Sequence, residues 1–194
     1  IIVTDSNDIA SVVTGFGGDV IRSQKEHHCG SDRIAEAVLD LDADIVINVQ
    51  GDEPFIRPEG LSSLIEIFKS EQKKDIDLAS LMIPIREEIN NPNVVKVITD
   101  MSNRALYFSR SAIPYQRNQE NHATVYKHVG VYAFRKNALI DFYQHDATPL
   151  EKVEKIEAIR YLEMGKTIQM VETQFEGVGI DTAEDLERAK KLMT

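Results

Sequence analysis

The sequence predicts an α/β protein with a mostly parallel sheet covered by helices on both faces. Over residues 1–83, short apolar, β-branched runs alternate with segments of helical periodicity, in the order β-α-β-α-β-α-β. The run Ile45–Val49 is almost continuously apolar, which is typical of a central parallel strand that is buried on both faces. From residue 91 onward this alternation stops, and we expect an inserted hairpin region there.

The first half of the chain is predicted element by element. Ile1–Asp5 has the pattern of a strand with its turn. Gly15–Gly18 ends a short helix and is not a phosphate loop, because the spacing is not G-x-G-x-x-G and no Lys follows. Ser31 is a suitable N-cap, and Pro58 suits a first helical position, where its missing N–H costs nothing. We expect strands at 1–5, 19–22, 45–49 and 77–83, and helices at 8–13, 33–41 and 58–73.

The second half opens with two short strands joined by the turn-like segment Asp100–Asn103, which predicts a hairpin. Thr182 suits the N-cap of the last helix, and Asp185 three residues later makes a variant of the capping box. We expect strands at 94–99, 104–110, 126–134 and 167–172, and helices at 136–145, 152–164 and after 182. Residues 1–194 are expected to form a single domain, with 91–135 as an insertion for dimerisation or for covering a substrate.

Composition and charge narrow the classes of function. The chain has 194 residues, with 42% hydrophobic and 28% charged, which suits one soluble globular domain. Its formal net charge of −10 argues against binding to nucleic acid or to an anionic membrane. The single Cys excludes an intramolecular disulfide and favours a reducing compartment, so we expect a cytoplasmic protein. No apolar run approaches the roughly 20 residues of a membrane span.

Polar side chains follow the strand 45–49 directly. Gly51 lets the backbone turn, and Gln50, Asp52 and Glu53 are left at the carboxyl end of the strand. Ligands of open α/β sheets bind at that edge, and a carboxylate there can hold a divalent metal that in turn holds phosphates. The alternative is an ordinary turn with a solvated acid, because Gly and Asp are common turn residues.

The loop before the second predicted helix carries two His, a Cys and an Arg, at His27–Arg33. Adjacent His residues make a poor chelate, and no second Cys or matching His pair follows, so the sequence disfavours a zinc site. Gly30, Ser31 and Arg33 instead form a suitable place for an anion or a polar base at a helix N-terminus. A plain capped helix is the alternative.

Five motifs follow one another along the chain: VQGDEP at 49–54, LYFSR at 106–110, HVGVY at 128–132, PLE at 149–151 and GIDTAEDL at 179–186. In this order they resemble the 3-deoxy-manno-octulosonate (Kdo) cytidylyltransferases, also called CMP-Kdo synthetases. The resemblance covers nearly the whole chain and implies the nucleotide-diphospho-sugar transferase type of α/β sandwich, with three layers.

The resemblance implies that the chain transfers CMP from CTP to Kdo, releasing pyrophosphate, in the synthesis of lipopolysaccharide. The anomeric hydroxyl of Kdo would attack the α-phosphorus in line, which requires both positioning and charge neutralisation. Mg²⁺ would supply the second, and Asp52 and Asp181 match the metal-binding carboxylates of the family. The resemblance also implies a homodimer.

Other roles carry over from the family by position. Arg110 suits the Kdo carboxylate, because a guanidinium can bind it with two parallel hydrogen bonds. His128 and Tyr132 lie four residues apart on a strand and therefore point to the same face. The residues that match the sugar site are Gln50, Arg110, His128, Tyr132 and Glu157, and those near the cytidine nucleotide are Ser31, Arg33 and Gln50.

The chain departs from the family pattern at several places. Ala158 stands where the family usually has Gln, so sugar contacts are expected to change. Cys29 and Ser31 replace a common Ser and Thr. The family begins with a strand and a basic loop resembling Ala-Arg-x-x-Ser-x-Arg-x-Pro-Gly-Lys that grips the triphosphate, and nothing here replaces it. We therefore expect residues upstream of Ile1, and little turnover of CTP without them.

Two other functions compete with this interpretation. The first is a cytidylyltransferase acting on another substrate, such as sialic acid or a polyol phosphate, with the same fold and metal logic. The second is a binding or scaffold protein of this fold that has lost the chemistry, as the missing loop and Ala158 suggest. The acids Asp52 and Asp181 argue against the second, because a scaffold does not need two carboxylates converging on one cleft.

Overall fold

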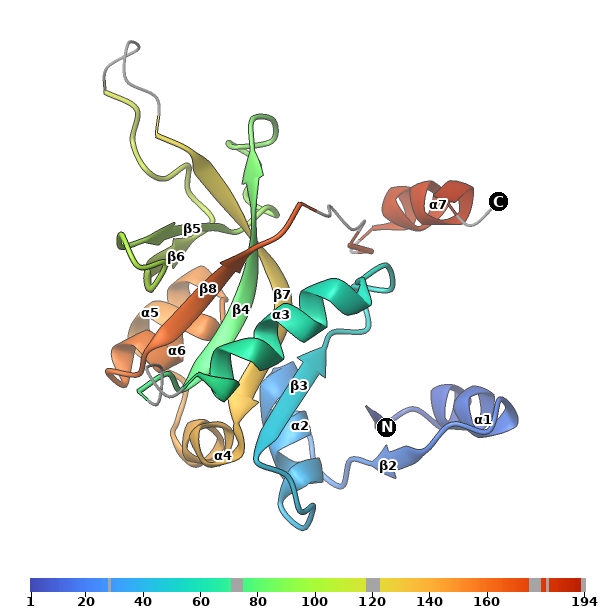
Figure 1. Cartoon of the computed structure of the whole chain (residues 1–194). Coiled ribbons are helices and arrows are strands. Elements are labelled where there is room, and N and C mark those ends of the chain that lie inside the picture. The colour runs from blue at the N-terminus through green and yellow to red at the C-terminus, as the bar shows by residue number, and fades with distance from the viewer. Residues whose placement is uncertain (28, 71–74, 118–122, 175–178, 181, 193–194) are drawn as a thin grey trace. The chain divides into compact units, whose positions relative to one another are not determined.

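The computed structural model describes residues 1–27, 29–70, 75–117, 123–174, 179–180 and 182–192 (Figure 1). The chain divides into two compact units. The first consists of 1–46 and 135–146, and the second of 47–134 and 147–194. The single domain and the role of 91–135 as an insertion stay predictions.

The first unit begins with the predicted strand, helix and strand, and its two strands form a small parallel sheet of their own. Strand β1 (Ile2–Thr4) pairs in parallel with β2 (Val20–Arg22), and helix α1 (Asn7–Gly15) connects them. Ser6 caps α1, because its hydroxyl oxygen accepts a hydrogen bond from the N–H of Ile9 at 3.3 Å. This β-α-β connection follows from the apolar periodicity of the first 22 residues.

Two helices pack together in the rest of the first unit. Helix α2 (Gly30–Val38) contacts α4 (Lys136–Gln144), and Leu139 and Phe142 of α4 are fully buried. The ammonium of Lys136 donates to the backbone oxygens of Leu39 at 3.1 Å and Leu41 at 2.5 Å. It therefore satisfies carbonyl groups at the end of α2 that have no partner within the helix.

The predicted N-cap of α2 is wrong. Helix α2 starts at Gly30, and its N-cap is Cys29, which makes no side-chain cap hydrogen bond. Ser31 lies inside the first turn and is fully buried. A short polar residue before an apolar stripe resembles an N-cap in sequence, but the observed N-cap, Cys29, lies two residues upstream.

The second unit is built on the larger sheet, whose strand order is β6-β5-β7-β4-β8, with β3 also pairing with β7. Strands β4 and β8 run parallel, while β4–β7, β5–β6 and β5–β7 run antiparallel. The α/β class and the hairpin are confirmed, and the antiparallel pairs arise in the region 91–135. The strands are β3 (Ile45–Val49), β4 (Leu78–Ile85), β5 (Lys96–Thr99), β6 (Ala105–Ser109), β7 (Val125–Arg135) and β8 (Ile168–Glu172).

Helices pack against this sheet from both sequence halves of the second unit. Helix α3 (Pro58–Lys69) contacts β4 and β8 through a stripe that includes the fully buried Leu64, and α6 (Ala158–Glu163) contacts β6. The predicted extension of α3 to residue 73 reaches 71–74, outside the described residues. Among those described, no helix has the length and apolarity to cross a membrane.

The last helix, α7 (Ala183–Leu192), starts as predicted. The N–H of Asp185 donates to the Thr182 hydroxyl at 3.2 Å, and the N–H of Thr182 donates to the Asp185 carboxylate at 3.0 Å. This reciprocal pair confirms the predicted capping box.

The predicted helix at 152–164 is two helices. Helix α5 (Pro149–Glu154) ends at Lys155, whose backbone is left-handed with φ 55° and ψ 46°, and α6 begins at Ala158. The Arg110 guanidinium takes up the backbone oxygens of Glu154 at 2.7 Å and Lys155 at 3.2 Å. In a continuous helix these two oxygens would accept from the N–H groups four residues on, and at the break Arg110, a residue far away in sequence, satisfies them instead.

The Pro149–Glu151 motif has a structural role in this fold. The Glu151 carboxylate accepts two hydrogen bonds from the Arg160 guanidinium, at 2.6 and 2.7 Å, and a third from the N–H of Thr148 at 3.0 Å. The Glu151 and Arg160 side chains are 9% and 2% exposed, so this ion pair is buried. It ties the start of α5 to α6 across the break between them.

Replacing Arg160 with Met should lower the free energy of unfolding by about 3–5 kcal/mol, because it leaves the buried Glu151 carboxylate without its counter-charge. Urea denaturation of the purified protein measures this change. Arg188→Met is the matched control, since Arg188 is 64% exposed in its ion pair with Asp185 and should change stability by less than about 0.5 kcal/mol. An Arg160 variant as stable as the control would contradict the prediction.

Candidate functional site

The turn after β3 carries Gln50 and Asp52 at the carboxyl end of the strand, as predicted. The N–H of Glu53 donates to the Gln50 carbonyl at 3.1 Å, which closes the turn, and the Asp52 side chain is exposed. The Asp52 carbonyl accepts the N–H of Ile180 at 2.8 Å. Ile180 directly precedes Asp181 in the sequence, and Asp181 itself lies outside the described residues. The described backbone therefore anchors the end of the GID segment on the Asp52 turn.

Gln50 lies next to two other residues of the predicted site. Its amide nitrogen donates to the Glu157 carboxylate at 3.4 Å. On its other side, a methyl group added to Gly130 of β7 would lie 3.7 Å from the Gln50 Cγ atom, so strand β7 passes close to this side chain. Gln50, Gly130 and Glu157 are brought together from positions up to 107 residues apart.

The sequence predicted that Glu157 lies on the surface of a continuous helix, and this prediction is wrong. It stands in the break between α5 and α6, as the residue just before α6, and is partly buried. The left-handed turn at Lys155 changes the direction of the chain there. The break therefore decides where the Glu157 carboxylate points.

Arg110 follows β6 and contacts the same break. Its guanidinium donates to the carbonyls of Glu154 and Lys155, described above, and to that of Pro92 at 2.9 Å. A guanidinium has five N–H donors, so one N–H on each terminal nitrogen is left over from these three bonds. The predicted role of Arg110 toward a carboxylate stays a prediction, and its structural role was not foreseen.

Lys96 is a buried residue that the sequence did not indicate. It is 0% exposed, and its ammonium donates to the carbonyls of Asn91 at 3.0 Å, Val94 at 2.5 Å and Arg110 at 2.6 Å. Burial is the main cause that lowers the pKa of Lys96, and the charge of Arg110 adds to it. In sequence, a Lys in a strand looks like a solvated edge residue. Three carbonyls that converge on one point are visible only in the fold.

His128 and Tyr132 lie on one face of β7, as predicted, with their ring centroids 5.4 Å apart. Both are buried, at 8% and 4% exposure, so they are not a half-exposed surface pair. The Phe108 ring packs edge-on against His128 at 5.0 Å. Burial lowers the pKa of His128 to about 3, so its imidazole is neutral at physiological pH.

The pairing of β7 with β4 shifts register between these two residues. Leu81 pairs with Val129 and Ser80 pairs with Tyr132, so Gly130 and Val131 have no partner on β4. The hydroxyl of Ser80 lies 2.9 Å from the Nε2 atom of His128. The bulge thus sits at the centre of the HVGVY motif, and sequence periodicity gives no sign of it.

Ser31 and Arg33, the residues with a predicted nucleotide role in the loop before α2, belong to the first unit. The Arg33 guanidinium pairs with the Asp5 carboxylate at 3.1 Å, and its Nε atom is buried with no hydrogen-bond partner among the residues that the structure describes. Ser31 is fully buried in α2. Their contact with a nucleotide stays a prediction.

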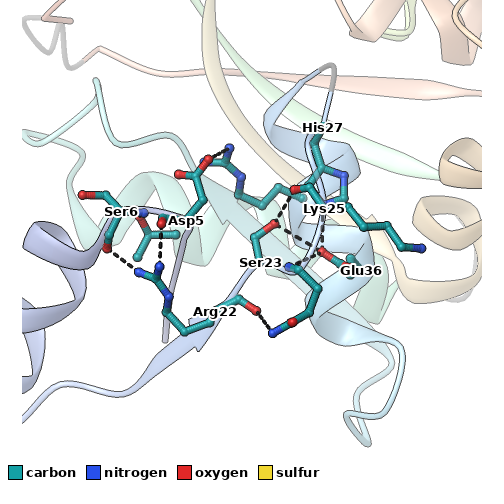
Figure 2. A network of polar contacts seen from close by, with 10 residues as sticks. Asp5, Ser6, Arg22, Ser23, Lys25, His27 and Glu36 are labelled. Atoms are coloured by element: carbon teal, nitrogen blue, oxygen red, sulfur yellow. Dashed lines mark hydrogen bonds and ion pairs between the residues drawn. The ribbon is translucent and has the colours of Figure 1, made fainter.

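In the loop at 27–33, for which the sequence disfavours zinc, His27 makes a different interaction within the first unit. The Nε2 atom of His27 lies 2.7 Å from the Glu36 carboxylate, which also accepts from the Ser23 hydroxyl and the Gln24 N–H (Figure 2). The hydrogen bond with His27 is the main cause that lowers the pKa of Glu36. His28 lies outside the described residues. In the described part of the chain, no three His, Cys, Asp or Glu side chains gather to hold a metal.

Comparison with known proteins places this geometry in one family. Residues 1–168 match the family model described as cytidylyltransferase. The chain is 57% identical over 195 residues to the 3-deoxy-manno-octulosonate cytidylyltransferase of Christiangramia forsetii, covering 100% of this chain and 79% of that protein. It is 56% identical over 194 residues to the enzyme of the same name from Flavobacterium johnsoniae, covering 99% and 80%.

Solved structures match the chain in the same way as these relatives do. A CMP:2-keto-3-deoxy-manno-octonic acid synthetase complexed with CTP matches with a TM-score of 0.91 and 38% identity, covering 98% of this chain and 78% of that one. HddC from Yersinia pseudotuberculosis matches with a TM-score of 0.68 and 16% identity over 99% of this chain and 76% of that one, which shows the shared fold alone.

The pKa of His128 predicts how stability changes with pH. The pKa of about 3 in the folded protein lies below the ordinary value of 6.5. The contribution of His128 to the free energy of unfolding is therefore complete above pH 6.5 and is lost as the pH falls toward 3. Between pH 7 and pH 5 this group should cost about 2 kcal/mol of unfolding free energy, from 1.36 kcal/mol per pH unit.

Urea denaturation of the wild type and of His128→Gln at both pH values measures this loss. The Gln variant keeps a nitrogen donor toward Ser80 but has no titratable group, so it should lose less stability by about 2 kcal/mol. Equal losses in the two proteins would show that His128 does not couple folding to pH.

Proposed function

The chain belongs to the cytidylyltransferase family, and on that premise we propose that it transfers CMP from CTP to the anomeric hydroxyl of Kdo, releasing pyrophosphate. The relatives carry the name of this activity, and one solved neighbour is a complex with CTP. The product is an activated sugar acid for lipopolysaccharide synthesis. The chain spans 79% of the relative's length, so the proposal concerns the greater part of such an enzyme.

The observation that carries the proposal is the convergence of Gln50, Glu157, His128 and Tyr132 in the second unit. Gln50 is hydrogen-bonded to Glu157 and lies against Gly130, which stands between His128 and Tyr132 on β7. Amide, carboxylate, imidazole and phenol groups together offer both donors and acceptors. That mixture suits a ligand with several hydroxyl groups.

Arg110 is the proposed partner of the Kdo carboxylate. The carbonyls of Pro92, Glu154 and Lys155 hold its guanidinium, and one N–H on each terminal nitrogen is left for a ligand. Two such N–H groups can bind a carboxylate through parallel hydrogen bonds. A carboxylate fixed in this way would orient the anomeric hydroxyl toward the α-phosphorus of CTP.

Asp52 and Asp181 are the proposed ligands of one Mg²⁺ ion. Two observations fit a hard cation at this place: the Asp52 carboxylate is exposed at the end of β3, and its backbone oxygen anchors Ile180, the neighbour of Asp181. When bound, Mg²⁺ would neutralise negative charge on the phosphates. Two carboxylates suffice, because phosphate oxygens and water commonly complete the shell of Mg²⁺.

Ser31, Arg33 and Gln50 are the proposed contacts to the nucleotide, from the resemblance of their loops to the family. A cytoplasmic homodimer completes the proposal. The single Cys suits a reducing compartment, and Met101 and Leu106 of the β5–β6 hairpin are large, exposed apolar residues that a second copy could cover. A monomer mass in sedimentation equilibrium would contradict the dimer.

The protein expressed from its complete reading frame should release pyrophosphate when it receives CTP, Mg²⁺ and Kdo. Pyrophosphate is measured by a coupled phosphatase assay, and the CMP-sugar by mass spectrometry. Sialic acid and a polyol phosphate are offered as competing acceptors, and ATP and UTP as competing donors. Turnover of sialic acid but not Kdo would overturn the assignment of the sugar, and no turnover of any acceptor would overturn the enzyme.

Replacing Asp52 with Asn should lower kcat/KM by about 100-fold or more, because a metal ion contributes several kcal/mol of charge stabilisation and 1.36 kcal/mol is tenfold in rate. The Mg²⁺ concentration for half-maximal activity should rise as well. Asp75→Asn is the control, since Asp75 is an exposed carboxylate paired with Arg104. Unchanged Mg²⁺ dependence in the Asp52 variant would remove Asp52 from the metal site.

A further inference from the structure

Ser80 is a fully buried polar residue of β4 to which the proposed chemistry gives no role. It pairs with Tyr132 at the edge of the β7 bulge. Its hydroxyl contacts three groups of that strand: the Nε2 atom of His128 at 2.9 Å, the Val131 carbonyl at 2.8 Å and the Val129 carbonyl at 3.3 Å. The bulge therefore directs two backbone oxygens at one side chain.

The single proton of the Ser80 hydroxyl fixes the direction of these three hydrogen bonds. A Ser hydroxyl has one proton to donate, and a carbonyl oxygen can only accept. The short contact to the Val131 carbonyl uses that proton, with the Val129 carbonyl as the weaker acceptor. If Nε2 of His128 took the proton instead, two acceptor oxygens would face each other at 2.8 Å without hydrogen. The Nε2 atom of His128 is therefore the donor, and Ser80 accepts from it.

This direction fixes the tautomer of His128. A neutral imidazole carries a single N–H, so a proton on Nε2 leaves Nδ1 as an acceptor. The ring stays neutral because it is buried, which lowers its pKa to about 3. Within the described residues, the only hydrogen bond of the ring is the one to Ser80, and the residue keeps 8% exposure. The Nδ1 acceptor therefore has no hydrogen-bond partner in the described part of the chain.

We propose that Ser80 is a positioning residue that holds His128 as the Nε2–H tautomer, so that Nδ1 accepts a hydrogen bond from a hydroxyl group of the sugar acid. This inference rests on the proposed function. It also assigns Arg110 and His128 to different groups of the sugar acid. A neutral acceptor cannot bind the Kdo carboxylate, which leaves that group to Arg110, and His128 selects a hydroxyl at a defined position.

The inference is tested on the protein from the complete reading frame, with the variants Ser80→Ala and Ser80→Thr. Ser80→Ala removes the acceptor for Nε2–H, and KM for Kdo should rise about tenfold, the equivalent of about 1.4 kcal/mol. KM for CTP should change less than about twofold. Ser80→Thr keeps the hydroxyl and should recover most of the affinity for Kdo.

Leu81→Val is the matched control for a loss of packing. Leu81 is the next residue of β4, is equally buried and points to the opposite face of the strand. Its truncation disturbs the core but leaves the Ser80 hydroxyl in place, so KM for Kdo should be unchanged. A rise as large as that of Ser80→Ala would assign the effect to packing and overturn the inference.

Nitrogen-15 NMR of the imidazole gives a readout that does not depend on activity. In the wild type without ligand, the His128 signals between pH 6 and 8 should be those of a neutral ring protonated at Nε2. A ring protonated at Nδ1 would overturn the inference even if the enzyme is active. A wild type that shows the Nε2–H tautomer but no turnover of Kdo would refute the proposed function and the sugar contact together, while leaving the Ser80–His128 bond established.

Discussion

The register shift between β4 and β7 is the constraint on which the sugar side of the site depends. Gly130 and Val131 have no partner on β4, so the backbone carbonyls around them need another donor. The Ser80 hydroxyl supplies it and in turn accepts from His128. The same extra residues leave Gly130 against Gln50. One irregularity in a strand therefore sets the place of three groups that the chemistry requires.

A second constraint comes from charged side chains that satisfy backbone carbonyls. Lys96 and Arg110 together take up carbonyl groups of six residues, and Arg110 takes two of them from the end of α5. Those oxygens lie at the break between α5 and α6, and Glu157, which stands in the same break, meets Gln50. The Glu151–Arg160 pair holds the two helices on either side of the break. Residues that look catalytic in sequence thus also stabilise the fold.

Periodicity predicted most elements because it reports burial, and burial follows from the local alternation of apolar residues. Strand β3, the β5–β6 hairpin and the Thr182–Asp185 capping box are examples. The errors fall where a distant residue competes with a local preference. The helix predicted at 152–164 is interrupted where Arg110 binds two of its carbonyls, and the N-cap expected at Ser31 is a buried position inside α2. Neither the helix break nor the position of the N-cap can be read from the local sequence.

By itself, the sequence determined the α/β class and the order of the elements, because these follow from side-chain chemistry and from spacing along the chain. The residues that a transfer of CMP to a sugar acid would use came from its motifs, through their resemblance to the Kdo cytidylyltransferases. Only the tertiary structure decided that Gln50 meets Glu157, that Lys96 and Ser80 are buried, and which nitrogen of His128 holds the proton. The reason is physical: hydrogen-bond direction and desolvation arise between groups from separate strands, and no single segment contains both partners.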